Sequence, residues 1–217
     1  RGWLGVRIQQ GSDEIAESLG LDRARGAMIA SVSPNGPAEK AKIEPGDVVL
    51  TFDGKEVGEM RRLPRIVAET PIEKKAPITV WRKGKELKLE VVVGELDETE
   101  VAAATPDTGK GGKDQGKASV DALGMSLAKI SADLRDKFSI DSGVDGVVVT
   151  DVAADSPAAQ KGLRAGDVIV EVAQETVKDP KDVADRVGKA KAAGRKSVLM
   201  LVDRQGDLRF VAIRLDG

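Results

Sequence analysis

Short apolar blocks separated by polar turns run along this chain, and the same order of blocks occurs twice, about 120 residues apart. The first half reads WLGV, GAMIASV and NGPAEKAKIEPGDVVLTF, and the second reads ALGM, GVVVTDV and DSPAAQKGLRAGDVIVEV. The spacing of Gly26 and Gly46 recurs unchanged in Gly146 and Gly166. Because shared glycines and prolines mark turns and helix starts, the sequence specifies one backbone twice. Such a repeat favours a binding or scaffolding device over a single active site.

The first repeat is predicted to contain short strands, two helices and one brief helix between them. Ser12 is expected to cap a helix over 13–19, and Pro37 suits the first position of the brief helix over 37–41. The second helix is predicted over 59–69; Pro64 lacks a backbone donor, so this helix either starts near Arg61 or is kinked. The expected strands are residues 3–9, 27–32, 48–52, 78–82 and 87–93.

The second repeat is predicted to follow the same order, with a helix over 180–190 capped by Asp179. Its expected strands are residues 123–128, 147–152, 168–172, 198–202 and 208–213. The order of elements predicts a mixed α+β, mostly β fold. Each repeat is then a small, partly open β-barrel or sandwich flanked by its helices, and not a parallel α/β sheet.

Two domains are predicted, over residues 1–97 and 119–217, joined by a linker over 98–118. Glycine, proline, alanine, threonine and charged residues dominate this linker, and its one large apolar residue is Val101. Such a composition buries too little surface to offset the entropy of ordering, so we expect a flexible segment.

Composition excludes several classes of function. The chain has no histidine and no cysteine, so it contains neither a Ser-His-Asp triad nor a disulfide or thiolate zinc site. A net charge of −2 offers no basic face for nucleic acid. No apolar run reaches the length of a membrane span. We expect no cofactor and no metal. The chain starts inside a predicted strand, and we interpret it as a piece of something longer.

Two motifs are better explained by structure than by chemistry. Residues 111–118 read GGKDQGKA, close to a phosphate-binding loop, but Ala118 stands where a hydroxyl is needed and no strand precedes the loop. Asp47 and Asp167 each follow a turn glycine, and such carboxylates usually accept hydrogen bonds from local backbone donors. No pair of carboxylates stands out as a general acid and base.

The segment around Gly5 is a candidate binding loop. A glycine between apolar residues at the start of a strand leaves successive backbone N–H groups free to converge on an anion, such as the terminal carboxylate of a peptide. The following strand would offer its free edge to that peptide. The alternative is that Gly5 is an ordinary glycine at the start of a strand. The matching ALGM of the second repeat does not distinguish a binding glycine from a structural one, because two copies of one fold would share the glycine in both cases.

The quoted motifs resemble a known family. RGWLGVRIQ, ESLGL, GAMIASVSPNGPAEKAKIEPGDVVLTFDGKEV and ITVWRKGKE are similar to the first PDZ domain of HtrA/Deg-type periplasmic serine proteases, and DGVVVTDVAADSPAAQKGLRAGDVIVEV is similar to the second. The resemblance covers everything except the linker. It implies two PDZ domains of the bacterial, permuted type and a parent serine endopeptidase of periplasmic quality control, whose protease domain lies outside this chain.

The resemblance also implies a function and its residues. Hydrophobic C-termini or exposed segments of misfolded clients would add as a strand to each PDZ groove, and occupancy would be relayed to the protease domain of a homo-oligomeric parent. In the first repeat, Arg1 would support the peptide's carboxylate by charge. The implied peptide-binding residues there are Arg1, Leu4, Gly5, Val6, Arg7, Ile8, Gln9, Leu63, Ile66 and Val67. Those of the second repeat are Leu123, Gly124, Met125, Ser126, Leu127, Val183 and Val187.

Other functions remain open from the sequence. Val120 stands where the first repeat has Arg1, so the second copy is expected to be the weaker peptide site and an oligomer-assembly contact. The main alternative is a non-catalytic scaffold or adaptor whose repeats pack against partner domains. A peptidase complete within this chain is the third hypothesis, and the missing histidine argues against it.

Overall fold

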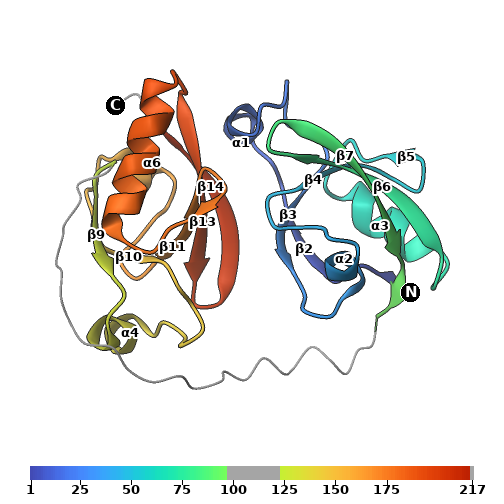
Figure 1. Cartoon of the computed structure of the whole chain (residues 1–217), viewed down its shortest axis with the longest axis horizontal. Helices are drawn as coiled ribbons and strands as arrows, with labels where there is room; N and C mark the ends of the chain where they lie inside the picture. Colours follow the sequence, from blue (N-terminus) through green and yellow to red (C-terminus); the bar gives the residue numbers. More distant parts are fainter. Residues whose placement is uncertain (97–122, 216–217) are drawn as a thin grey trace. The chain divides into compact units, whose positions relative to one another are not determined.

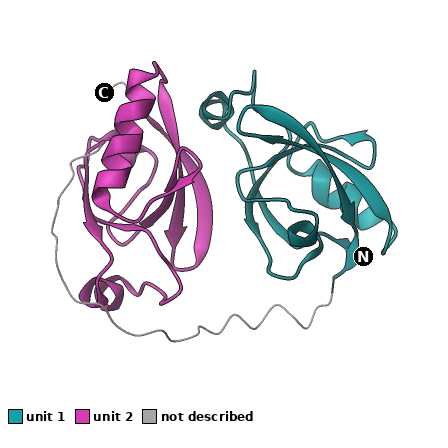
Figure 2. Cartoon of the chain, in the orientation of Figure 1, with its two compact units in different colours: residues 1–103 teal, residues 104–217 magenta. Residues whose placement is uncertain are grey.

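The computed structural model describes residues 1–96 and 123–215 (Figure 1). The chain divides into two compact units, residues 1–103 and 104–217, which we call unit 1 and unit 2 (Figure 2). The predicted linker over 98–118, and with it the loop that resembles a phosphate-binding motif, lies outside the described residues. No helix of the described part of the chain has the length and apolarity needed to cross a membrane.

Unit 1 is built on an open, antiparallel sheet with strand order β2-β3-β4-β6-β7, and the short β5 pairs with β4. A second, two-stranded sheet joins β1 to β8. The strands are β1 (Gly2–Trp3), β2 (Val6–Gln9), β3 (Ala27–Val32), β4 (Val48–Phe52), β5 (Lys55–Glu56), β6 (Lys75–Arg82), β7 (Lys85–Val92) and β8 (Gly94–Glu95). The predicted strand over 3–9 is wrong in one respect, because it breaks at Leu4 and Gly5.

The helices of unit 1 are α1 (Asp13–Ser18), α2 (Pro37–Lys40) and α3 (Arg62–Glu69). Ser12 caps α1, since its side chain accepts a hydrogen bond from the N–H of Ile15. Helix α3 starts after Arg61, which places Pro64 in its first turn. The N–H groups of a first turn have no partner within the helix, so the missing donor of Pro64 costs nothing there.

Unit 2 repeats this architecture, with strand order β14-β13-β11-β10-β9 and β12 paired to β11. Asp179 and Asp182 form a capping box at the start of its longest helix. The strands are β9 (Met125–Lys129), β10 (Val147–Val152), β11 (Val168–Val172), β12 (Glu175–Thr176), β13 (Ser197–Arg204) and β14 (Asp207–Arg214). The helices are α4 (Ala132–Phe138), α5 (Pro157–Gln160) and α6 (Pro180–Ala192).

Each unit has its own hydrophobic core between its sheet and its longest helix. Phe52 and Ile78 are fully buried in unit 1, and Met200 and Ile213 in unit 2. The fold is therefore mixed α+β and rich in strands, as predicted, with sheets that stay open and do not close into barrels.

A buried carboxylate bound by an arginine secures the same turn in both units. Asp47, 1% exposed, accepts hydrogen bonds from Arg82 Nε at 2.7 Å, from Arg82 Nη2 at 2.6 Å and from the N–H of Glu44 at 3.0 Å. These bonds raise the pKa of the Arg82 guanidinium above its ordinary value. Arg82 also donates to the carbonyl of Lys42 at 2.8 Å.

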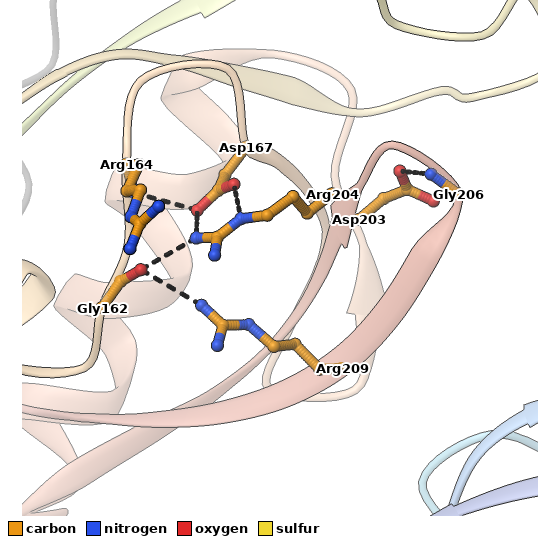
Figure 3. Close-up of polar contacts among 7 residues, drawn as sticks. All are labelled: Gly162, Arg164, Asp167, Asp203, Arg204, Gly206 and Arg209. Carbon is orange, nitrogen blue, oxygen red and sulfur yellow. Dashed lines mark hydrogen bonds and ion pairs between the residues drawn. The ribbon is translucent and has the colours of Figure 1, made fainter.

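Asp167 repeats the arrangement in unit 2 (Figure 3). It accepts from Arg204 Nε and Nη2, each at 2.7 Å, and from the N–H of Arg164 at 2.9 Å. Both aspartates therefore tie the turn before β4 or β11 to the hairpin that ends the sheet. The prediction that they accept local backbone donors is confirmed.

We predict that Asp47→Ala lowers the free energy of unfolding of unit 1 by about 3 kcal/mol, because it removes the buried partner of the half-buried Arg82, which then keeps only the exposed Glu44 and the carbonyl of Lys42. Both tryptophans of the chain, Trp3 and Trp81, lie in unit 1, so urea unfolding followed by tryptophan fluorescence reports on that unit. The matched control is Asp167→Ala, which should leave the fluorescence transition in place. A loss below 1 kcal/mol in Asp47→Ala would show that the clamp is dispensable.

Candidate functional site

The candidate site of unit 1 lies along β2, the edge strand of its sheet. Among the described strands β2 pairs only with β3, so its other edge faces no strand of unit 1. An edge of this kind can take up a further strand by backbone hydrogen bonding.

Two consecutive peptide units at the start of β2 are oriented by hydrogen bonds to their carbonyl oxygens. The carbonyl of Leu4 accepts from the N–H of Ala38 at 2.9 Å, and the carbonyl of Gly5 accepts from the N–H of Ser33 at 2.8 Å. The described residues contain no cis peptide bond, so each N–H points opposite to the carbonyl of its own peptide unit. The N–H groups of Gly5 and Val6 therefore point away from α2 and β3, although Gly5 itself is buried and Val6 half-buried.

The conformation of this loop depends on glycine. Gly5 has a φ of +71°, a region that residues with a Cβ rarely adopt. A Cβ added there would lie 3.2 Å from the Trp3 ring and 3.4 Å from the Cα of Gly36. Trp3 therefore lies directly against the loop. The N–H of Gly5 has no backbone acceptor among the described turns and loops.

Apolar side chains with differing exposure border the edge of β2. Val6 and Ile8 are half-buried and pack against the core, whereas Leu63, Ile66 and Val67 on α3 are buried in it. The helix stripe predicted to line a groove is thus part of the core of the free protein. Its role in peptide binding stays a prediction.

The polar members of the predicted set lie around this edge. Arg1 and Arg7 are exposed, and Gln9 is half-buried at the end of β2. The carbonyl of Arg1 accepts a hydrogen bond from the N–H of Leu96 at 3.3 Å, which joins the start of unit 1 to the residue that follows β8.

Beyond the end of β2, unit 1 contains a hollow of about 340 Å³. It lies between the residues that follow β2, the loop before β3 and the residues that lead into α3. Its lining residues are Gln10, Gly11, Ala24, Arg25, Gly26, Gly58, Glu59, Met60 and Arg61. A chain that continued along the edge of β2, away from Gly5, would reach this hollow.

The equivalent strand of unit 2 presents less apolar surface. Met125 and Leu127 are fully buried, unlike the half-buried Val6 and Ile8 of unit 1. Helix α6 packs against β9, β11 and β13, whereas the main strand contacts of the shorter α3 are with β1 and β4. Val183 and Val187 of α6 are buried in the same core as Met125 and Leu127. The space between edge strand and helix is therefore filled more completely in unit 2.

The loop of unit 2 also differs in its backbone. Leu123 and Gly124 both have positive φ, +60° and +78°, and a Cβ added to Gly124 would lie 2.2 Å from the Cβ of Ser156. The carbonyl of Gly124 accepts from the N–H of Ala153 at 2.8 Å, so the N–H of Met125 points away from β10. Ser126, half-buried, follows in β9.

Sequence reasoning places Trp3 beside the first loop, as the structure has it, but it missed the donors that fix this loop, Ser33 and Ala38. Pro37 marks the start of α2, but nothing in the sequence indicates that α2 donates its Ala38 N–H to the carbonyl of Leu4. Within the described residues, no group of three or more acidic side chains could hold a metal ion.

Comparison with known proteins gives the same assignment for both units. The PDZ domain family matches residues 2–93, and a second PDZ domain family matches residues 148–204. A probable periplasmic serine endoprotease DegP-like of Brucella suis biovar 1 is 39% identical over 223 residues, across 100% of this chain and 40% of that protein. A protein of the same description from Pseudomonas putida (strain GB-1) is 35% identical and is covered over 43% of its length.

Among solved structures, the HtrA-type protease AlgW with decapeptide is 42% identical across 43% of this chain and 29% of that one, with a TM-score of 0.40. The chain thus spans about 40% of the length of the Brucella relative.

We predict that alanine is tolerated less well at Gly124 than at Gly5. Both glycines have positive φ, which costs an alanine about 1–2 kcal/mol. At Gly124 the added Cβ also collides with Ser156, whereas at Gly5 it meets only the tip of Trp3 and the Cα of Gly36 at ordinary distances or slightly less. Urea unfolding followed by circular dichroism should show a loss for Gly124→Ala at least 1 kcal/mol larger. Equal losses would mean that Ser156 moves aside freely.

Proposed function

The chain belongs to the PDZ-domain family, with one PDZ domain in each unit, and from this premise we propose that unit 1 binds the C-terminal segment of a polypeptide. The observation that carries the proposal is the pair of N–H groups of Gly5 and Val6, which point away from α2 and β3 beside an unpaired strand edge. A carboxylate is the acceptor to which such a pair of backbone N–H groups would donate best.

The rest of the bound peptide, here called the guest, would lie as an extra strand along β2. With its carboxylate at Gly5, the guest runs antiparallel to β2, and its earlier residues extend past Gln9 to the hollow beyond the strand. Main-chain hydrogen bonds supply affinity in this mode, and alternate side chains supply specificity. The last side chain of the guest would contact the exposed parts of Val6 and Ile8, and reach Leu63, Ile66 and Val67 by opening the space beside α3.

Arg1 supports the proposed carboxylate site through its charge. Its side chain is exposed at the start of the unit, so this contribution is a long-range attraction that salt weakens. The two backbone donors fix the position of the carboxylate.

We infer that unit 2 is the weaker peptide site and serves as an assembly contact. Its edge strand buries Met125 and Leu127 under α6, and Ser156 fills the space beside Gly124. Core side chains of unit 2 would therefore have to move before a side chain of a bound peptide could enter.

For the whole protein, we propose a periplasmic serine endoprotease of the HtrA/Deg type, acting in protein quality control. Unit 1 would capture exposed hydrophobic ends of misfolded proteins and signal their presence to a protease domain in a homo-oligomer. The chain has no histidine and hence no Ser-His-Asp triad of its own. The competing function, a scaffold whose units pack against partner domains, has no use for a free peptide carboxylate.

We predict that a hydrophobic heptapeptide with a free C-terminus binds with a Kd on the order of micromolar, and that its amidated form binds at least tenfold more weakly. Amidation removes the negative charge of the carboxylate to which the N–H groups of Gly5 and Val6 would donate hydrogen bonds. Trp3 lies against Gly5, so its fluorescence should change on titration.

The control for this titration is Gly5→Ala, which should weaken the free-acid peptide toward the affinity of the amide. Equal affinity of the acid and amide forms in the unaltered chain would exclude the carboxylate site and favour the scaffold.

We further predict that N-methylation of alternate amides of the same peptide has a different effect on the Kd at each edge of the bound peptide strand. Methyl groups on the amides that face β2 should abolish binding, because each removes a ladder hydrogen bond and adds a clash. Methyl groups on the amides that face away should change the Kd less than threefold. Indifference to both patterns, measured by the same titration, would rule out strand addition.

A further inference from the structure

The hollow beyond β2 is lined by two arginines and one carboxylate. Arg25 lies in the loop before β3, and Arg61 directly precedes α3. Glu59 supplies the carboxylate, and among the described residues no ion pair joins it to either arginine. The other lining residues are uncharged: Gln10, Gly11, Ala24, Gly26, Gly58 and Met60. The side chains that line the hollow therefore carry a net positive charge.

Arg25 is held only loosely by its own chain. Its side chain makes no hydrogen bond within the described residues, and its Nε is buried. Asp22 Oδ1 lies 3.5 Å from this Nε, outside hydrogen-bonding geometry, and the Asp22 side chain is 70% exposed. An ion pair as exposed as this one contributes little to stability. The guanidinium of Arg25 therefore keeps donors for a further acceptor.

Arg61 is the second donor group beside the hollow. It is exposed, and within the described part of the chain its side chain has neither an ion pair nor a hydrogen bond. The first turn of α3, which follows it, contains no acidic residue. The charge of Arg61 is thus balanced only by solvent and by the more general field of unit 1.

The equivalent place in unit 2 has a different set of charges. Asp145 directly precedes the second copy of the glycine that follows Arg25, so it stands where unit 1 has this arginine. Asp179 corresponds to Glu59, and its Oδ1 lies 3.6 Å from Lys129 Nζ. The positive hollow is therefore a feature of unit 1 and not of the shared fold.

The proposed guest would bring one particular side chain to this hollow. With its last residue opposite Val6, one-to-one antiparallel pairing places the residue four positions before the last opposite Gln10, which follows β2 directly. Side chains alternate along a strand, so Val6, Ile8 and Gln10 share a face, and opposite residues of the guest lie on the same face. Because Gln10 lines the hollow, the guest side chain at this position would enter it.

We propose that the hollow is a second subsite, where Arg25 and Arg61 bind the carboxylate of a glutamate or aspartate four residues before the C-terminus of the guest. The inference rests on the proposed peptide site of unit 1. It narrows the ligands of that site to polypeptide ends that combine a hydrophobic terminus with an acidic residue upstream. The planar fork of a guanidinium matches the two oxygens of a carboxylate. Met60, half-buried in the lining, would contact the methylene groups of a glutamate.

The test titrates the whole chain with two N-acetylated heptapeptides and follows tryptophan fluorescence. Both peptides have a hydrophobic, free C-terminus, and they differ only in having glutamate or glutamine four residues before the last. At low salt the glutamate peptide should bind at least fivefold more tightly. Glutamate three residues before the last stands opposite Gln9, on the other face, and should lose most of this advantage. Equal affinity of the first two peptides would overturn the subsite.

The decisive variant is Arg25→Asp, which installs the residue that unit 2 carries and so suits the fold. It should reduce the advantage of the glutamate peptide over the glutamine peptide to less than twofold. The matched control is Arg23→Asp, which makes the same change in charge at an exposed position outside the lining of the hollow. It should keep at least a threefold advantage. Equal losses in both variants would assign the preference to overall charge and contradict the site.

A second variant tests the other arginine. Arg61→Gln, at an exposed position, should lower the advantage of the glutamate peptide at least twofold, and an unchanged advantage would contradict the role of Arg61. A peptide with lysine at the tested position should bind Arg25→Asp more tightly than it binds the unaltered chain, because the charges are then exchanged. Failure of this exchange would count against direct contact with residue 25.

Failure of the subsite and failure of the peptide site give different results. If the glutamine peptide binds and is weakened by amidation, but glutamate adds no affinity, the subsite is wrong and the peptide site stands. If no peptide with a free C-terminus binds, both proposals are wrong.

Discussion

The geometry of the candidate site in unit 1 depends on two hydrogen bonds that orient a loop. Ser33 and Ala38 donate to the carbonyls of Gly5 and Leu4, and the planarity of the peptide bond then directs the N–H groups of Val6 and Gly5 to the opposite side. The positive φ of Gly5 permits this arrangement. Ser33 directly follows β3 and Ala38 lies in α2, so folding of the unit orients the loop by itself. For the proposed peptide site, this would reduce the entropy that binding must overcome.

The two units share one backbone and differ in a few side chains beside the loop, beneath the longest helix and around the clamp. Gly36 in unit 1 leaves room beside the loop, whereas Ser156 in unit 2 occupies it. The eight-residue α3 leaves Val6 and Ile8 half-exposed, whereas the thirteen-residue α6 covers Met125 and Leu127. Around the shared aspartate clamp, Glu44 and Leu87 are replaced by Arg164 and Arg209. Unit 1 thus leaves more room beside its edge strand than unit 2 does.

The clamp itself is a structural device common to both units. Asp47 and Asp167 are almost fully buried, and each satisfies its charge with one arginine fork and one backbone N–H. Burial of an ion pair without such complete hydrogen bonding would be costly. The clamp joins a turn in the middle of each unit to its last hairpin, so it couples segments far apart in sequence.

The sequence by itself determined the elements and their duplication, because periodicity, caps and turn residues act over a few residues. Ser12, Pro37 and Asp179 mark helix starts where the structure has them, and the strands over 27–32 and 48–52 agree residue for residue. The tertiary structure alone decided that Leu63 and Val67 are buried in the core, how the loop carbonyls are bound, and that Arg204 and Arg209 both donate to the carbonyl of Gly162. These hydrogen bonds join residues 28 to 47 positions apart, and local patterns do not encode such contacts.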